Sequence, residues 1–201
     1  MKLLKYFFII LLILCTNIYV FADKVSIGIK FISFSTHPKG DPNAHLMPLK
    51  FDPKGVIVFN PGGTLNFDFF IKNDFLSLKL VQGFYADCAL QFLGYSHLGF
   101  RLTLFQTKYA SMNLGIGPTF IYRQSWYKLP GYKAYPNFFN GTKNENWEYS
   151  FIWYGGEIEL NFPILKNTDF SMSIIPGGIE VINVSLGFRY TVDIANNKNR
   201  T

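Results

Sequence analysis

The stretch INVSLGFRYTV, residues 182–192, decides the fold. Six apolar side chains alternate in it with polar residues and a glycine, and the register never breaks. Because successive side chains of an extended strand point to opposite faces, this pattern predicts a β-strand with one apolar and one polar face.

The same period of two recurs upstream of this strand. It is clear in 65–72, 97–104 and 112–123. It is weaker in four further segments, 24–34, 75–85, 147–162 and 169–176. Together these segments predict about eight strands, several of which reach the 9 to 11 residues that a tilted transmembrane strand needs. No comparable helical period is found after residue 22.

The connections between these strands alternate in length. Short polar turns are expected at 72–74, 106–108 and 166–169. Longer connections, rich in Pro, Gly and Asn, are expected at 36–55, at about 86–96 and at 124–146. Up-and-down strands with all long loops at one end produce this alternation, which is typical of outer-membrane barrels. The hairpin at Pro176-Gly177-Gly178 is the exception, because it is tight where a long loop is expected.

The composition of the polar face indicates which side of the sheet meets water. Its positions are largely Gly, Ser, Thr and Asn, which suits a crowded lumen better than a solvated surface. We expect the charges of both signs on this face to pair inside the barrel; they are Lys30, Asp68, Lys79, Arg101, Arg123, Glu157, Glu159 and Arg189. Two alternatives remain open: separate charges on a solvated surface, and a soluble lipocalin-like carrier with its apolar side chains inside.

The opposite face is rich in aromatic residues, which make up 18% of the chain, whereas charged residues make up only 16%. Ordinary globular chains have about 25% charged residues. Leu, Ile and Phe in mid-strand read as a lipid-facing band, and the aromatic residues near the strand ends read as its girdles; they are Tyr122, Trp126, Tyr149 and Tyr190.

The first 22 residues have the features of a secretory signal peptide. Lys2 and Lys5 precede an apolar run that ends at Leu14, and Ala22 offers a cleavage site. The alternatives are an uncleaved anchor, for which the run is short, and lipidation at Cys15, for which Leu14 is bulky. We therefore divide the chain into a signal peptide (1–22), a barrel (23–195) and a polar tail (196–201).

The expected mature chain has only one cysteine, Cys88, so it can form no internal disulfide. Loss of Lys2 and Lys5 lowers the 19 basic residues by two against 13 acidic ones, which leaves a net charge of about +4. The basic residues are scattered, so nucleic acid is not an expected partner.

The signal peptide, the alternating strands and the closing strand 182–192 resemble the small outer-membrane barrel proteins of the OmpA and OmpW type. The resemblance covers most of the mature chain and is one of pattern. It implies an all-β antiparallel barrel in the outer membrane of a bacterium with two membranes, with outer-membrane lipid and the barrel-assembly machinery as partners. Such proteins usually end on an aromatic residue, whereas this chain continues past Phe188 and Tyr190 to Thr201.

Candidate chemistry is sparse. Lipid A deacylases, which are also small outer-membrane barrels, suggest a triad of Ser96, His97 and Glu157, but adjacent residues of one strand point to opposite faces. His37, Asp41 and His45 match no recognised metal-site spacing, so neither a metal nor another cofactor is expected.

The favoured function is therefore non-enzymatic, with a lipid A hydrolase as the alternative. A barrel this narrow is not expected to conduct solutes freely. The long loops are expected to contact the environment, a surface partner or a small apolar ligand. The loop 124–146 carries the aromatic residues that we expect to serve such recognition, unless they pack down as a lid: Trp126, Tyr127, Tyr132, Tyr135, Phe138 and Phe139.

Overall fold

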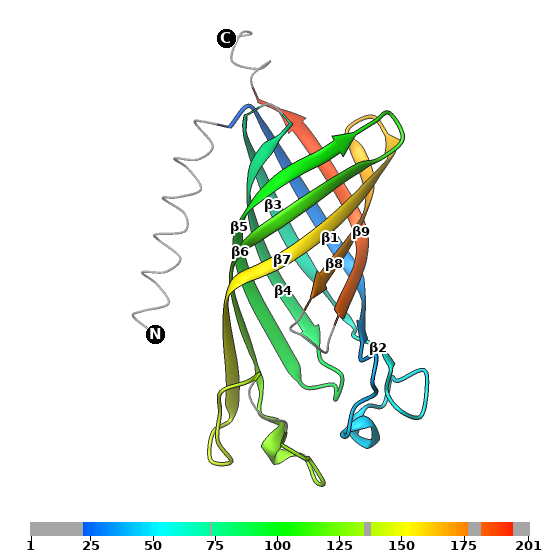
Figure 1. The fold of residues 1–201 in the computed structure, drawn as a ribbon, viewed down its shortest axis with the longest axis vertical. Coiled ribbons are helices and arrows are strands. Elements are labelled where there is room, and N and C mark those ends of the chain that lie inside the picture. The colour runs from blue at the N-terminus through cyan, green and yellow to red at the C-terminus, as the bar shows by residue number, and fades with distance from the viewer. Residues whose placement is uncertain (1–21, 73, 135–137, 177–181, 195–201) are drawn as a thin grey trace.

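The computed structural model describes residues 22–72, 74–134, 138–176 and 182–194 (Figure 1). Apart from two short 3-10 helices, η1 (Ala44–Leu46) and η2 (Trp126–Lys128), the regular elements of these residues are strands. No helix within the described residues has both the length and the apolar character needed to cross a membrane. Most of the expected signal peptide and the tail from residue 195 lie outside the described residues, as do Tyr135 and residues 177–181.

The strands form one antiparallel sheet that closes on itself. In chain order, the strands of the closed ring are β1 (Lys24–Thr36), β3 (Gly62–Lys72), β4 (Leu76–Ala86), β5 (Phe92–Gln106), β6 (Ser111–Gln124), β7 (Trp147–Leu165), β8 (Thr168–Pro176) and β9 (Ile182–Asp193). Each strand pairs with the next, and β9 returns to pair with β1. The described residues therefore form an eight-stranded up-and-down barrel, and the predicted fold class is confirmed.

The seam between β1 and β9 closes the barrel. Its register runs from Lys24 opposite Asp193 to Thr36 opposite Ile182, with one irregularity between Lys30 and Ile32. This pairing leaves no open sheet edge in the ring, so the backbone groups of both terminal strands gain hydrogen-bond partners.

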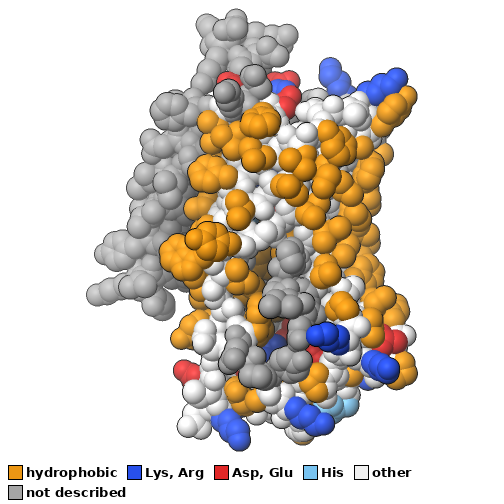
Figure 2. Space-filling view, viewed as in Figure 1, with side chains coloured by type: hydrophobic (Ala, Val, Ile, Leu, Met, Phe, Trp, Pro, Cys, Tyr) orange, Lys and Arg blue, Asp and Glu red, His pale blue; other side chains and the backbone are white. Residues whose placement is uncertain are grey.

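The two faces of the barrel have the reverse of the polarity of a soluble protein. Every strand of the ring has buried, inward-facing residues that are polar or charged, as with Ser26 on β1, Asn66 on β3, Ser77 on β4, Asn113 on β6 and Ser185 on β9; Phe70 and Val81 are apolar exceptions. Large apolar side chains are exposed on the outside, including Ile29, Phe100, Leu104, Ile116 and Phe188. Figure 2 shows hydrophobic side chains over much of the wall, with charges mostly towards its two ends. A lipocalin-like interior lined by apolar side chains is excluded for this part of the chain.

The two ends of the barrel differ as the sequence predicts. At the turn end, strands are joined by the short connections 73–75, 107–110 and 166–167. The described chain ends also meet there, where the backbone N–H of Ile194 donates to the carbonyl of Asp23 at 2.9 Å (Figure 1). At the loop end lie the longer segments 37–61 and 125–146.

Two details of the loop end differ from the sequence prediction. The connection expected at about 86–96 is only 87–91, because β5 begins at Phe92. Within this short connection, the Asp87 carboxylate accepts hydrogen bonds from the backbone N–H groups of Ala89 and Gln91, both at 2.9 Å, which stabilise the tight turn. In addition, the first long segment contains a short strand, β2 (Ile57–Phe59), which extends the sheet beside the end of β1 and which the sequence analysis missed.

The alternation of β7 is weak because the strand contains a β-bulge. Gly155 pairs with Gly117 and Ile152 pairs with Thr119, so two residues of β7, Trp153 and Tyr154, oppose the single Pro118 of β6. Proline has no N–H to donate to the ladder, and bulges accommodate such positions. The bulge moves the inward face from even to odd residue numbers and leaves both aromatic side chains exposed on the outside.

Closure predicts a strict requirement for glycine at position 187. A Cβ atom there would overlap the carbonyl oxygen of Ile29 and lie 2.5 Å from the Cα of Lys30 across the seam. We expect Gly187→Val to abolish the compact, heat-sensitive form of the barrel in gel electrophoresis. Gly115→Ala is the control, since its Cβ would meet no atom closer than 3.6 Å. A Gly187→Val protein that keeps the compact form would contradict this account of the seam.

Candidate functional site

A cluster of charged side chains, termed the plug, fills the barrel interior. Its centre is a pair of glutamates on β7, Glu157 and Glu159. The ammonium of Lys79 on β4 donates to both, at 2.5 and 2.6 Å. The ammonium of Lys30 on β1 donates to Glu159 at 2.8 Å. Hydrogen bonds from the Ser173 hydroxyl to Glu157 and from Lys30 to that hydroxyl complete this half of the plug.

The other half of the plug is built on guanidinium groups. Arg101 on β5 contacts Glu159 at 2.7 Å and Asp68 of β3 at 3.1 Å. Arg189 on β9 contacts Asp169 at 2.6 Å and reaches Glu159 at 3.7 Å. Glu159 therefore interacts with cations from four strands.

Alternation and small residues explain why these charges meet. Arg101 and Glu157 lie opposite the same residue, Gly115, and Lys79 lies opposite Gly99. Glycine leaves lumen space, which the long charged side chains fill. The four cations and four carboxylates of the plug balance, which is required because a buried unpaired charge is costly.

A polar hollow of about 170 Å³ lies at the turn end. Its lining includes the ion pairs Lys24 with Asp74 and Arg189 with Asp169, and also Asn113. The Asn113 amide nitrogen is buried and has no hydrogen-bond partner among the described residues, and the same holds for Nε and Nη2 of Arg101 deeper in the barrel. Polar groups of this kind are ordinarily satisfied by water in a lumen.

Arg123, which the sequence analysis grouped with the plug charges, makes its contacts nearer the loop end. Its guanidinium pairs with buried Glu148 at 2.6 Å. It also lies over the rings of Trp126, 4.5 Å from the centroid, and Phe139, 3.9 Å from the centroid. The ion pair with Glu148 of β7 holds Arg123 in the barrel wall, and the two cation–π contacts join it to the long loop.

The segments of the loop end pack together as a small apolar cluster, termed the loop cap. Its buried members are Met47, Val58, Cys88, Ala89 and Trp126, with Leu46, Leu129 and Tyr132 packed against them. They come from three connections that are far apart in sequence. The indole N–H of Trp126 donates to the Asp87 carboxylate at 2.5 Å, which fixes the third connection to the second.

The aromatic residues of the long loop pack mainly on one another. Trp126 is only 5% exposed, so it does not belong to a lipid-facing girdle, and that expectation was wrong. Tyr132 packs edge to face against both Trp126 and Tyr127. Phe138 and Phe139 contact each other with ring centroids 4.9 Å apart. Tyr122, Tyr149 and Tyr190 lie on the wall, where Tyr149 and Tyr190 are exposed.

The structure does not bring Ser96, His97 and Glu157 together as a triad. The Ser96 hydroxyl donates to Gln82 at 2.7 Å on the outer face. The His97 ring contacts the Thr119 hydroxyl at 2.7 Å on the inner face. Both residues lie within β5 and not at the start of a strand, because β5 begins earlier than expected. A serine whose hydroxyl points away from the imidazole lacks its general base.

The residues weighed as metal ligands are also separated. His37 and Asp41 contact each other at 3.4 Å, whereas the ring of His45 lies 3.2 Å from the carbonyl of Gly131. Among the described residues, no group of three or more His, Cys, Asp or Glu side chains is placed to hold a metal ion.

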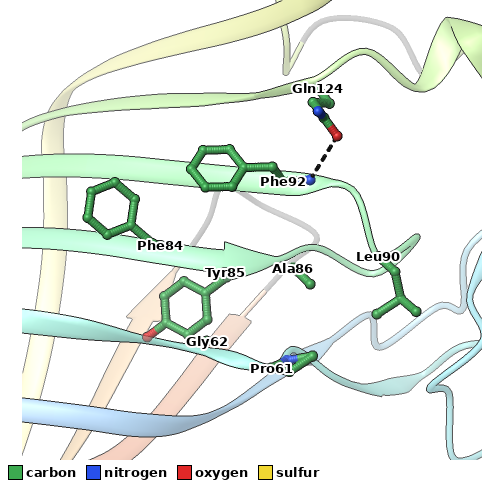
Figure 3. A pocket seen from close by; sticks show the side chains of 8 residues that line it. All are labelled: Pro61, Gly62, Phe84, Tyr85, Ala86, Leu90, Phe92 and Gln124. Atoms are coloured by element: carbon green, nitrogen blue, oxygen red, sulfur yellow. Dashed lines mark hydrogen bonds between the residues drawn. The ribbon is translucent and has the colours of Figure 1, made fainter.

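A shallow apolar recess of about 440 Å³ lies where β3, β4 and β5 reach the loop end (Figure 3). Phe84 and Phe92 form one side, and Pro61 and Leu90 form the other. Leu90 has a positive φ of 57°, a conformation that costs energy for a branched side chain, and it is held there by a hydrogen bond to the Asp87 carbonyl.

Comparison with solved structures finds other small barrels. The chain is similar to Ail, the attachment invasion locus protein of Yersinia pestis, with 14% identity, a TM-score of 0.47 and coverage of 85% of this chain and 99% of that one. It is similar to the outer membrane protein OprG of Pseudomonas aeruginosa, with 12% identity, a TM-score of 0.47 and coverage of 85% and 96%. It is also similar to Neisserial surface protein A, with 8% identity, a TM-score of 0.47 and coverage of 86% and 98%. No family model matches the sequence, and no curated protein matches it.

The plug predicts a large stability loss when its most connected carboxylate is neutralised. Glu159→Gln leaves Lys30 and Arg101 buried without their strongest partner, so we expect the free energy of unfolding to fall by about 3–5 kcal/mol. Urea unfolding of the protein in lipid bilayers measures this. Glu145→Gln, on an exposed loop residue, is the control and should change stability by less than about 0.5 kcal/mol. Equal stabilities of the two variants would mean that the plug contributes no net stability.

Proposed function

We propose that this protein is an integral outer-membrane barrel with a closed lumen, without enzymatic activity, that presents a folded loop cap to the outside of the cell. The observation that carries the proposal is the reversed polarity of the wall. Phe100, Leu104 and Ile116 are each more than half exposed, while Lys79, Arg101 and Glu159 are buried inside. In water, both the exposure of the apolar outer face and the burial of the charged inner face would cost free energy. The hydrocarbon core of a bilayer favours the apolar outer face.

The strand lengths fit this setting. The strands of the ring have between 9 and 19 residues, and a tilted strand of 9 to 11 residues crosses a bilayer. Every strand of the ring has both neighbours, which meets the requirement that backbone polar groups be satisfied in lipid. The expected signal peptide supports export, and assembly by the cell's barrel-assembly machinery then follows for an outer-membrane barrel.

The asymmetry of the ends supports the orientation. Outer-membrane barrels have short periplasmic turns and longer outer loops. The turn end then faces the periplasm and the loop cap faces the outside. Because charged side chains from seven strands of the ring meet in the lumen, the barrel does not serve as a general diffusion pore.

The loop cap supports a role in surface contact. The exposed lysines of the loop end outnumber its exposed acidic residues; they are Lys39, Lys54, Lys128, Lys133 and Lys143. The carboxylates of Asp52 and Glu145 are held by backbone N–H groups of their own loops. A basic surface of this kind suits contact with an environmental partner, which is the role expected for the long loops, although the expectation rested on the aromatic residues of 124–146.

The membrane assignment predicts that arginine lowers stability at an exposed apolar position of the wall but not at one of the loops. We expect the protein to fractionate with outer membranes and to migrate faster on gels unless heated. Phe100→Arg should cost about 2–4 kcal/mol of stability in a bilayer, the cost of a cation near the midplane. Leu49→Arg, at an exposed loop position, should be neutral. Recovery of the processed protein as a monomer in detergent-free buffer would refute the proposal.

The recess at the loop end favours a second candidate function, the binding of a small apolar ligand. Its lining is mainly apolar, and it is an open recess, not an enclosed cavity. Leu90, held in a costly backbone conformation, directs its side chain to this recess. Residues held in energetically costly backbone conformations cluster at binding sites.

A photoreactive apolar probe, a phenyl diazirine, tests the recess in lipid nanodiscs. Labelling at Phe84 and Leu90 should saturate with probe concentration, because a site has a limited capacity, whereas labelling of Phe100 on the open wall should rise linearly. Ala86→Trp, which fills the recess, should remove the saturable part, and Leu98→Trp on the wall should not. Linear labelling at every position would eliminate the second candidate.

A further inference from the structure

One contact in the loop cap joins two titratable side chains that the proposed function does not use. His37 directly follows β1, and Cys88 lies in the connection after β4. The thiol sulfur of Cys88 is 3.5 Å from Nε2 of the His37 ring. The other ring nitrogen, Nδ1, is 3.4 Å from the Asp41 carboxylate. The Asn60 amide donates to the same sulfur at 3.7 Å.

Both partners of this contact are buried, with 8% of each residue exposed. Burial raises the pKa of the Cys88 thiol to about 11, so the thiol keeps its proton and donates it. Burial also lowers the pKa of His37, although the Asp41 carboxylate acts in the opposite direction. The neutral ring then accepts from the thiol at Nε2 and carries its proton on Nδ1, the nitrogen that faces the Asp41 carboxylate.

The order thiol, imidazole, carboxylate is also that of a cysteine nucleophile with its base. A nucleophilic cysteine, however, needs a thiolate, and its pKa is depressed by its surroundings. The opposite shift at Cys88, beneath the apolar side chains of the loop cap, makes it unreactive while the cap is closed. The contact is therefore structural in the closed state.

This contact joins the first two of the three connections of the loop end. His37 ties the first connection to Cys88 of the second, and the neighbour of Cys88, Asp87, ties the second connection to Trp126 of the third. Cys88 and Trp126 are also members of the apolar cluster of the cap. A change at His37 therefore acts on all three segments.

We propose that the contact between His37 and Cys88 is an acid-sensitive latch, which holds the loop cap closed near neutral pH and releases it as the pH falls. Protonation puts a hydrogen on Nε2, so the ring can no longer accept from the thiol, and only the weak acceptor capacity of the sulfur is left for this contact. It also places a charge inside the apolar cap. The latch does not depend on the membrane role, since it lies in the loops.

The sign of the effect follows from linkage. The pKa of His37 is lowered in the closed cap, and in an open loop it returns to about 6.5. The open state therefore binds the proton more readily. The contribution of neutral His37 to the free energy of closure is fully present above about pH 6.5. It is lost as the pH falls from there towards the lowered pKa of His37.

Other groups near the latch have different signs or different ranges of pH. Burial raises the pKa of Asp87, so its protonation favours the closed cap as the pH falls. The Cys88 thiol titrates only at alkaline pH. Asp41 is the acidic partner of His37 itself. Opening on acidification thus identifies His37, and tightening on acidification would identify Asp87.

Cys88 provides a probe of opening, because it is the only cysteine after residue 22. We would measure its rate of reaction with 4,4′-dithiodipyridine in bilayers between pH 5 and 7.5 and identify the modified peptide by mass spectrometry. Division by the rate of an exposed reference thiol, Lys143→Cys in a Cys88→Ala background, removes the pH dependence of the thiol chemistry. The protection of Cys88 should fall on acidification, by up to about tenfold per pH unit between the two pKa values of His37.

The matched variants are His37→Gln and His45→Gln, which remove one buried and one exposed loop histidine. Protection in His45→Gln should follow the parent protein, whereas protection in His37→Gln should not change with pH over this range. Protection that is constant or rises on acidification in the parent protein would overturn the latch. An unchanged pH dependence in His37→Gln would do so as well.

A second measurement tests the latch even if the His37→Gln substitution loosens the loop cap by itself. The ring proton signals of the parent protein give the pKa of each histidine by NMR titration. We expect the pKa of His37 to lie below 6.5, the value of an unperturbed histidine. A pKa of His37 at or above this value would remove the physical basis of the latch.

Discussion

The closure of β9 onto β1 is the constraint on which the rest of the structure depends. Once the sheet is a ring, each strand has one face inside and one outside, and the inner face must fill a narrow lumen. In this chain the inner face contains the charges, so they must pair. The Glu159 carboxylate meets this need by forming ion pairs with cationic side chains from β1, β4, β5 and β9.

The same closure determines what remains for the loops to do. Ion pairs cross the lumen, and the outer wall is largely apolar between its ends. Distinctive chemistry is therefore concentrated at the loop end, where three connections share one apolar cluster. Arg123 and Asp87 join that cluster to the barrel, through Glu148 in one case and through the ends of β4 and β5 in the other.

Several parts of the fold could be predicted from the order of residues alone. Residues 182–192 lie within β9 and 65–72 within β3, and the short turns lie at the end where alternation placed them. The bulge of β7 was beyond such reasoning, because the shift at Trp153 and Tyr154 depends on Pro118 of the neighbouring strand. The loop cap was also beyond it. Trp126 is an aromatic residue near a strand end, as girdle residues are. Its buried position involves a hydrogen bond to the carboxylate of Asp87, which lies 39 positions away in the sequence.

The sequence by itself determined the period of two, the polarity of each face and the lengths of the connections, because these are local properties of an extended chain. Only the tertiary structure decided which charges are partners, that His37 meets Cys88, and which partners Ser96 and His97 have. These are contacts between strands or loops separated by tens of residues. Their geometry is set by strand register and ring closure, which no single segment specifies.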